Sequence, residues 1–161
     1  MMKSTTVQDS QEMRELGAIV ASKLLAGDVV VLTGPLGAGK TTFAQGIGRG
    51  LGLIDAITSP TFVVAREHRG GRDNLSLMHV DAYRLPSSDD LVDLELDSIR
   101  PHVTLIEWGA DFASKITDSW LEVCISRTNE GTESEPDAGP REVFFIGHGP
   151  RWSELEIAGL S

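Results

Sequence analysis

The sequence predicts an α/β fold in which helices cover a mixed β-sheet. Residues 29–32, VVVL, are apolar without alternation, which is typical of a strand buried on both faces of a parallel sheet. A glycine-rich segment follows this run, and a helical pattern follows the glycines. Further along, two β-rich segments flank a turn, which indicates an antiparallel hairpin. Strands that alternate with helices therefore favour an α/β sandwich around a mixed, largely parallel sheet.

The length and composition are those of one packed domain. Domains commonly have about 100 to 150 residues, so a chain of 161 residues suits a single domain over residues 1–161. Apolar residues make up 40% of the chain and charged residues 24%, which is the usual globular mixture. No apolar run reaches the roughly 20 residues of a membrane span, and the N-terminal MMKSTTVQDSQEM lacks the apolar segment of a secretory signal. We therefore expect a cytoplasmic protein that does not act on a membrane.

The net charge limits which ligands the protein can bind, and the cysteine content indicates its cellular compartment. The formal net charge is -10, from 24 acidic and 14 basic side chains, so the protein as a whole repels phosphate backbones and is not expected to bind nucleic acid stably by itself. A single nucleotide is compatible with this charge, because phosphate-binding loops act through local backbone dipoles. Cys124, the single cysteine, lies in the apolar run WLEVCI and is interpreted as a core residue in a reducing compartment.

The N-terminal half begins with a predicted amphipathic helix over residues 9–25. Its apolar residues recur at spacings of three and four, and Asp9 with Glu12 forms a capping pair. Gly27 and Asp28 mark its end. The strand at 29–32 follows, and then a helix at about 40–51. Residues 62–67 and 75–80 are the predicted hairpin strands, joined by the turn-forming RGGRDN.

The C-terminal half alternates in the same way. Residues 87–99, SSDDLVDLELDSI, predict an acidic helix capped by Ser87 or Ser88. A strand at 103–106, a short helix at 111–116 and strands at 120–127 and 142–148 complete the fold. Residues 128–140 are polar, acidic and rich in Gly and Pro, which predicts a flexible loop inside the domain.

The most specific local motif is a phosphate-binding loop. The pattern G-x-x-x-x-G-K-[ST] is filled by Gly34, Pro35, Leu36, Gly37, Ala38, Gly39, Lys40 and Thr41. The glycines let several backbone amides point at one spot, and the following helix adds its positive end. Lys40 supplies a charge for the β- and γ-phosphates, and Thr41 supplies a hydroxyl for magnesium. Thr42 is either a second polar contact or an ordinary residue of the first helical turn.

Two carboxylates end apolar runs, Asp81 after LMHV and Glu107 after VTLI. A phosphoryl-transfer site needs a carboxylate near magnesium and a group that orients the nucleophile. Because the carboxyl ends of parallel strands line the ligand crevice, we expect both acids beside the phosphate loop. Each alone is more commonly a solvated acid, but two acids in a chain with this loop favour a functional role. The sequence leaves open which acid binds the metal and which orients water.

Three further features have two interpretations each. TSPTF, residues 58–62, is either a loop that responds to the γ-phosphate or a proline-stiffened start of a strand. Trp108 either stacks on a base or a partner, or packs in the core. His79 is either structural or a support for the site. The remaining histidines lack metal-ligand spacing and receive no role: His68, His102 and His148.

Four motifs in order, GPLGAGKTTF, SPTF, HVDAYRL and LIEW, resemble the bacterial TsaE family (formerly YjeE) over about residues 9–120. The resemblance implies a P-loop NTPase-like sandwich and an ATPase, slow on its own, in the biosynthesis of threonylcarbamoyladenosine in tRNA. It implies ATP and Mg²⁺ as cofactors and the TsaD and TsaB subunits as partners. In that family TsaD modifies an adenosine next to the anticodon, so the ATPase contacts tRNA only indirectly through the complex.

The resemblance also implies roles for single residues. Lys40, Asp81 and Glu107 would be catalytic, with Glu107 and Thr41 holding magnesium and Asp81 assisting at the metal or the attacking water. Residues 36–42 would bind the triphosphate, and Trp108 would lie beside the nucleotide. Arg141 matches a family arginine at the start of the last strand, although Pro140 is inserted before it. A switch-like segment would contain Ser59 and Thr61.

Three functions agree with these features. The first is an ATP-hydrolysing subunit of the tRNA-modifying assembly. The second is a small-molecule kinase, which usually needs a basic lid, whereas residues 128–140 are acidic. The third is an ATP-gated docking module in which hydrolysis is incidental. The order of the four motifs favours the first.

Overall fold

The computed structural model describes residues 2–35, 37–53, 65–82, 101–108, 110–127 and 139–153. Several predicted features lie outside these described residues: the acidic helix at 87–99, the switch-like Ser59 and Thr61, Leu36 of the phosphate loop, and residues 128–138 of the acidic loop. Within the described ranges, no helix is long and apolar enough to cross a membrane.

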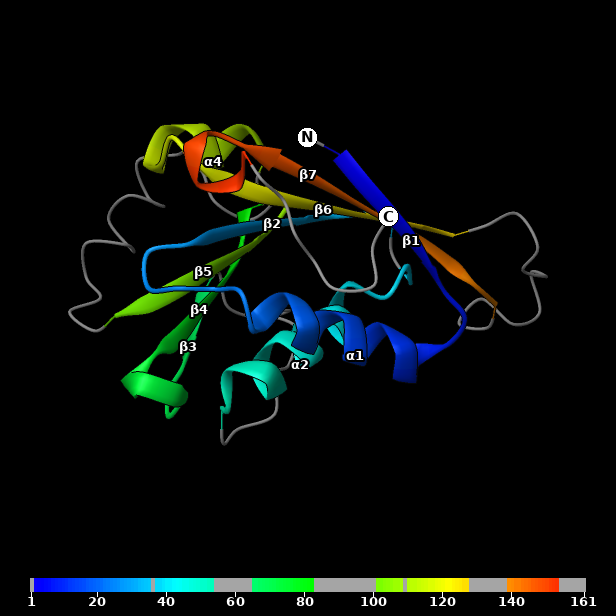
Figure 1. The fold of residues 1–161 in the computed structure, drawn as a ribbon, viewed down its shortest axis with the longest axis horizontal. Helices are drawn as coiled ribbons and strands as arrows, with labels where there is room; N and C mark the ends of the chain where they lie inside the picture. The colour runs from blue at the N-terminus through cyan, green and yellow to red at the C-terminus, as the bar shows by residue number, and fades with distance from the viewer. Residues whose placement is uncertain are drawn as a thin grey trace.

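A seven-stranded sheet with the order β1-β7-β6-β2-β5-β4-β3 forms the middle layer (Figure 1). Its strands are β1 (Met2–Val7), β2 (Val29–Thr33), β3 (Ala65–His68), β4 (Ser76–Asp81), β5 (His102–Glu107), β6 (Trp120–Arg127) and β7 (Arg141–His148). The central strands β6, β2, β5 and β4 run parallel, whereas the β3–β4, β6–β7 and β1–β7 pairs are antiparallel. The predicted largely parallel sheet and the predicted hairpin are both confirmed.

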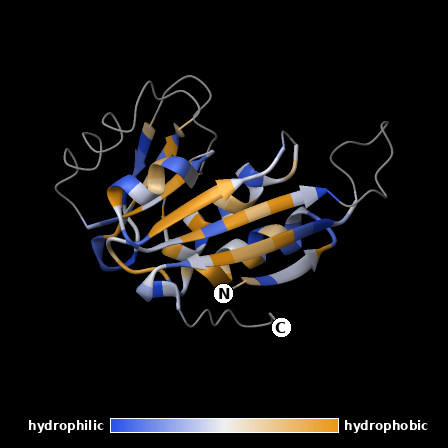
Figure 2. Ribbon diagram, turned by 90° about the horizontal axis from the view of Figure 1, so that it is seen from above, coloured by the Kyte–Doolittle hydropathy of each residue, from blue (hydrophilic) through white to orange (hydrophobic). Residues whose placement is uncertain are grey.

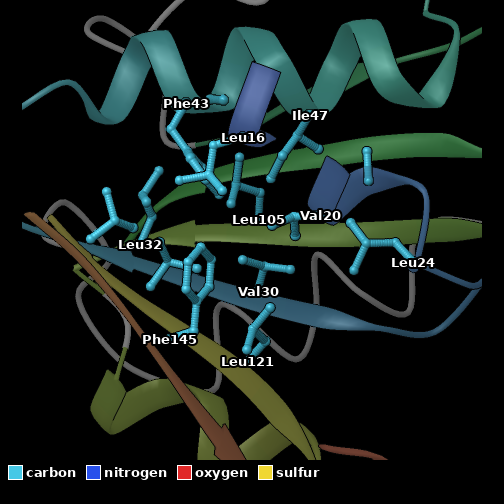
Figure 3. Packing of buried hydrophobic residues seen from close by; sticks show 14 of the residues in the cluster. Leu16, Val20, Leu24, Val30, Leu32, Phe43, Ile47, Leu105, Leu121 and Phe145 are labelled. Carbon is cyan, nitrogen blue, oxygen red and sulfur yellow. The ribbon is translucent and has the colours of Figure 1, made fainter. Parts of the chain in front are cut away.

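Helices cover both faces of this sheet. The helices α1 (Ser10–Ala21) and α2 (Lys40–Leu51) lie on one face, and the short helix α4 (Ala110–Ile116) lies on the other (Figure 1). The larger buried cluster fills the space between the sheet and the α1–α2 layer (Figure 3). In β2, Val30 and Leu32 belong to this cluster, while Val29 and Val31 pack with the α4 side. Burial on both faces explains why the sequence of β2 shows no alternation.

The strands β6 and β7 are buried on one face only, and their sequences alternate accordingly. In β6, Leu121, Val123 and Ile125 belong to the cluster under α1 and α2, and the residues between them are only half-buried. Figure 2 shows the resulting alternation of hydrophobic and hydrophilic bands along the strands. Cys124 is one of the half-buried residues, so its interpretation as a core residue is wrong.

The helices α1 and α2 are in backbone contact. A methyl group added at Gly17 of α1 would lie 2.4 Å from the carbonyl oxygen of Phe43 in α2. At Gly46 of α2, it would lie 2.2 Å from the carbonyl oxygen of Arg14. Both distances are shorter than real side chains allow, so these two positions require glycine because of close approach rather than because of a turn.

The first helix begins as predicted. Asp9 Oδ1 accepts a hydrogen bond from the Glu12 amide at 2.9 Å, and Glu12 Oε2 accepts one from the Gln8 amide at 2.7 Å. The first bond satisfies an amide that the helix itself leaves unpaired, and the second fixes the residue that precedes the N-cap. The predicted capping pair is therefore confirmed.

The same helix ends at Ala21, four residues before its predicted end. Ser22 Oγ donates to the carbonyl oxygen of Ile19 at 2.6 Å, and the guanidinium of Arg72 donates to the carbonyl oxygens of Ala21 and Leu24 at 2.9 and 2.8 Å. These bonds take carbonyls that a longer helix would use. Leu24 stays fully buried beyond the end of the helix, which explains why the apolar pattern extended to it.

The strand β1 was not predicted. It lies at the edge of the described sheet and, among the described strands, pairs only with β7, from Met2 opposite Ile146 to Val7 opposite Arg141. Between its two ends it contains only polar residues, KSTT, and only three of its six residues are half-buried or buried, so it has no continuous apolar face. Its pairing with a strand more than 130 residues away, rather than its own composition, specifies this strand.

Candidate nucleotide-binding site

The phosphate loop connects the central strand β2 to α2. The strand lies between β5 and β6 and parallel to both, so the loop leaves the sheet at the carboxyl end of its parallel strands. Gly37 and Gly39 have φ of 78° and 110°, a left-handed conformation that other residues rarely adopt. Helix α2 begins at Lys40, as the sequence predicted, with Gly39 as its N-cap. The loop therefore lies at the positive end of a twelve-residue helix.

Lys40 lies at the mouth of this loop. Its Nζ donates to the carbonyl oxygens of Gly34 and Pro35 at 2.6 and 3.0 Å and lies 4.6 Å from the centre of the Trp108 ring. The side chain is buried, and burial lowers the pKa of Lys40 from its ordinary value of 10.5; the negative charges of Glu107 and Asp81 oppose this shift. Lys40 thus interacts with the ring of Trp108 and with the charges of both acids.

Asp81 and Glu107 come from neighbouring parallel strands. Each is the last residue of its strand, β4 or β5, and the two are direct register partners. Glu107 is also the register partner of Leu32 in β2, two residues before the phosphate loop. The structure therefore brings both predicted acids to the edge of the sheet where the loop begins. Glu107 is buried, whereas Asp81 is half-buried.

Glu107 has a buried hydrogen-bonding partner on the neighbouring strand. Its Oε2 lies 2.9 Å from Nε2 of His79, which is fully buried in β4. His79 lies two residues before Asp81 and therefore on the same face of the sheet. The sequence offered HVD as a pattern, but it could not show that the histidine contacts an acid 28 residues away.

Trp108 follows Glu107 directly and leaves the sheet. Its amide donates to the carbonyl oxygen of Leu32 at 3.1 Å, and its φ of 62° is unusual for a large side chain. This backbone turns the ring out of the β5 direction, so that 46% of the residue is exposed while the ring contacts Lys40. Of its two interpretations, core packing is wrong.

Arg141 contacts the phosphate loop from behind. It is the first residue of β7 and is buried. Nε donates to the carbonyl oxygen of Ala38 at 3.2 Å, and Nη2 donates to that of Gly37 at 3.4 Å. Nη1 donates to the carbonyl oxygen of Gly139 at 2.8 Å. The guanidinium therefore fixes loop backbone, and its contact with a nucleotide stays a prediction.

The remaining predicted ligands are less defined. Thr41 and Thr42 are half-buried in the first turn of α2, and both interpretations of Thr42 stay open. Carboxylate and hydroxyl oxygens of Asp81, Glu107 and Thr41 make a hard, oxygen-only donor set, which fits Mg²⁺. Proteins commonly hold this ion with one or two carboxylates and complete its shell with phosphate oxygens and water.

These features define a P-loop NTPase-like nucleotide-binding protein. They are a central parallel strand, a glycine-rich loop with its lysine, and two acids at the ends of adjacent strands. The family model described as "Threonylcarbamoyl adenosine biosynthesis protein TsaE" matches residues 7–135. The chain belongs to the TsaE family.

Individual relatives agree with this assignment. A TsaE protein of Streptomyces coelicolor is 44% identical over 92% of this chain and 99% of its own length. A TsaE protein of Bacillus subtilis is 33% identical over 90% of this chain and 85% of its own length. Both carry the name tRNA threonylcarbamoyladenosine biosynthesis protein. The crystal structure of Bacillus subtilis YdiB has a TM-score of 0.70 at 28% identity and covers 96% of this chain and 90% of its own.

Proposed function

We propose that this protein is the ATP-binding and ATP-hydrolysing subunit required for threonylcarbamoylation of the adenosine next to the tRNA anticodon. It acts in the cytoplasm with the TsaD and TsaB subunits and contacts tRNA only through that complex. The observation that carries the proposal is the register pair Asp81 and Glu107 beside Lys40 at the phosphate loop. Family membership supports the pathway, and the net charge of -10 supports a protein partner rather than direct tRNA binding.

The proposed roles of the residues follow from their chemistry. Backbone amides of residues 37–41 and the positive end of α2 bind the phosphates, while Lys40 places its charge at the β- and γ-phosphates. Thr41 and Glu107 hold Mg²⁺, and Asp81 assists at the ion or accepts a hydrogen bond from the attacking water. When bound, Mg²⁺ supplies charge neutralisation for the phosphate oxygens.

Trp108 and Arg141 act at the borders of the same site. The exposed face of Trp108 is available for a nucleotide, because only part of its ring is covered by Lys40. Arg141 keeps the loop carbonyls of Gly37 and Ala38 directed away from the phosphates, which leaves the amides free to bind them. These positions support a preorganised site.

The test is ATP turnover by the purified chain, alone and with TsaD and TsaB from the same organism. We expect slow turnover alone, faster turnover with both subunits, and none for Lys40→Ala in either setting. If the subunits neither bind the chain nor raise its turnover, the proposal is wrong. Modification of tRNA supported by a Glu107→Ala protein that binds ATP without hydrolysing it would indicate a docking module instead.

A further inference from the structure

His79 occupies a position in β4 that an apolar residue would ordinarily fill. It lies on the same face of the strand as Leu77, a member of the cluster under α1 and α2, and both residues are fully buried. Its register partner on β5, Leu105, belongs to the same cluster. A histidine in this environment must be compensated for the loss of water around its ring. The compensating contact is the one to Glu107.

Glu107 needs the same contact. Its side chain is only 8% exposed, and a buried carboxylate is stable only when hydrogen-bond donors replace water. An ionised carboxylate accepts hydrogen bonds and donates none, so the 2.9 Å contact requires a proton on His79 Nε2. Within the described part of the chain, Nδ1 is buried and has no hydrogen-bond partner. Nε2 is therefore the ring atom that donates to Glu107.

We infer that His79 is the positioning residue for Glu107: its Nε2–H holds Oε2 in place and so fixes the orientation of the carboxylate that would hold Mg²⁺. The inference rests on the proposed function, in which Glu107 is a ligand of the ion. It assigns the histidine no contact with nucleotide or metal. Hydrogen bonds to the outer oxygen of a metal ligand fix the orientation of that ligand, and their loss typically costs about 10- to 100-fold in metal affinity.

The strands supply the rigidity that this role needs. His79 and Glu107 lie on the adjacent parallel strands β4 and β5, and β5 also pairs with the central strand β2. Glu107 is two residues further along β5 than the register partner of His79, so the contact is diagonal. The imidazole spans this diagonal with only two side-chain torsions, whereas a longer flexible side chain would lose more conformational entropy on burial.

The experiment measures how strongly Mg²⁺ raises the affinity for a non-hydrolysable ATP analogue, by calorimetry in Mg²⁺ and in EDTA. For His79→Leu we expect this enhancement to fall by at least about tenfold, while the affinity in EDTA stays unchanged. His79→Gln places an amide N–H where Nε2 lies and should restore most of the enhancement. His79→Asn is too short to reach and should not. A merely structural histidine would lower the melting temperature of all three variants and leave the Mg²⁺ enhancement intact.

Two controls separate this inference from the proposed function. Glu107→Gln should lose the enhancement, and adding His79→Leu to it should cost nothing more, because both changes act through one carboxylate. His68→Gln alters another buried histidine, at the end of β3 opposite Leu77 of β4, and should leave the enhancement unchanged. If Glu107→Gln keeps full enhancement, the proposed metal ligand is wrong. If only His79→Leu keeps it, the metal ligand stands and the positioning role is wrong.

A measurement on the unmodified protein covers the case in which His79→Leu does not fold. Nitrogen NMR of the histidine rings distinguishes the two neutral tautomers. We expect the ring of His79, assigned by its absence in His79→Gln, to carry its proton on Nε2. Nε2 without a proton would contradict the inference, because it could then not donate to Glu107.

Discussion

Arg141 Nε donates to the carbonyl oxygen of Ala38 at 3.2 Å, which joins the first residue of the last strand to the phosphate loop 103 residues earlier. The charge of the guanidinium is buried and is distributed over carbonyl oxygens of the loop and of the residues before β7. The loop is therefore supported by both ends of its own strand–helix connection and by a third segment of the chain.

We expect Arg141→Ala to lower the free energy of unfolding by roughly 2 kcal/mol, since hydrogen bonds from a charged donor contribute about 1.5 to 3 kcal/mol. The affinity for ATP should fall as well, because the loop backbone loses its support. Chemical denaturation and calorimetry check the two effects. Arg127→Ala, at the register partner of Arg141 on β6, is the matched control and should change neither quantity appreciably. Equal effects of both substitutions would contradict the role of Arg141.

Lys40 should make stability depend on pH in a defined direction. Its pKa in the folded protein is lowered by burial, so below that pKa the folded state bears the cost of a buried charge. As pH rises through the folded pKa toward 10.5, the lysine loses its proton more readily in the folded state, and the cost disappears. The free energy of unfolding therefore rises with pH between the folded pKa of Lys40 and 10.5.

The comparison of wild type with Lys40→Met isolates this effect. At neutral pH the variant should melt at the same or a higher temperature than the wild type, although it loses ATP binding. The difference between their melting temperatures should shrink as pH rises toward 10.5. If the wild type instead melts at a higher temperature than Lys40→Met at neutral pH, and this difference disappears at alkaline pH, the prediction is wrong. Attraction of Lys40 to Glu107 and Asp81 then outweighs the cost of burial.

Gly17→Ala tests the backbone contact between α1 and α2. The added methyl would meet the Phe43 carbonyl at 2.4 Å, and overpacking of this kind costs about 1 to 3 kcal/mol. The better helix propensity of alanine returns about 1 kcal/mol. Because the colliding atom is backbone and cannot rotate away, we expect a net loss of about 2 kcal/mol in chemical denaturation. Gln11→Ala, on the exposed side of α1, should stay within about 0.5 kcal/mol of wild type.

Cys124 should react slowly with iodoacetamide at neutral pH. Burial is the largest cause that raises its pKa above 9.0, and the Glu122 carboxylate adds to the shift, so less thiolate is present than for a free thiol. Thr33 Oγ1 donates to the sulfur at 3.1 Å and opposes the shift. Thr33→Val keeps the shape and removes this donor, so its labelling should be slower still. Labelling of the wild type as fast as glutathione would contradict the assignment.

Local sequence patterns correctly predicted the helix ends that are fixed by residues close to them in the sequence. The helix α2 begins and ends where the sequence placed it, because the phosphate-loop motif fixes its start and Gly52, in the left-handed conformation, caps its end. The capping pair of Asp9 and Glu12 was predicted for the same reason. The end of α1 was misplaced, since a distant arginine, Arg72, takes its last carbonyls.

The sequence predicted which residues belong to the candidate site, but it did not predict the contacts that their side chains make. Strand ends and motif spacing identified Lys40, Asp81 and Glu107, because parallel strands bring such positions together. The contacts of Glu107 with His79 and of Arg141 with Ala38 depend on the order of strands in the sheet, which no local pattern encodes. The edge strand β1 was missed for the same reason, since the strand with which it pairs, β7, lies at the other end of the chain.

Arg72 gives the molecule a link between two of its parts. From the turn between β3 and β4, its guanidinium bonds to Ala21 and Leu24 at the end of α1 and to Gly50 near the end of α2. If this turn moves away from the helices, the carbonyl oxygens at both helix ends lose these hydrogen bonds. In native-state hydrogen exchange, we expect amides of the hairpin and of the last turns of α1 and α2 to open as one cooperative unit. Through the side chain of Arg72, opening of the helices next to the phosphate loop is thus coupled to opening of β4, the strand that ends at Asp81.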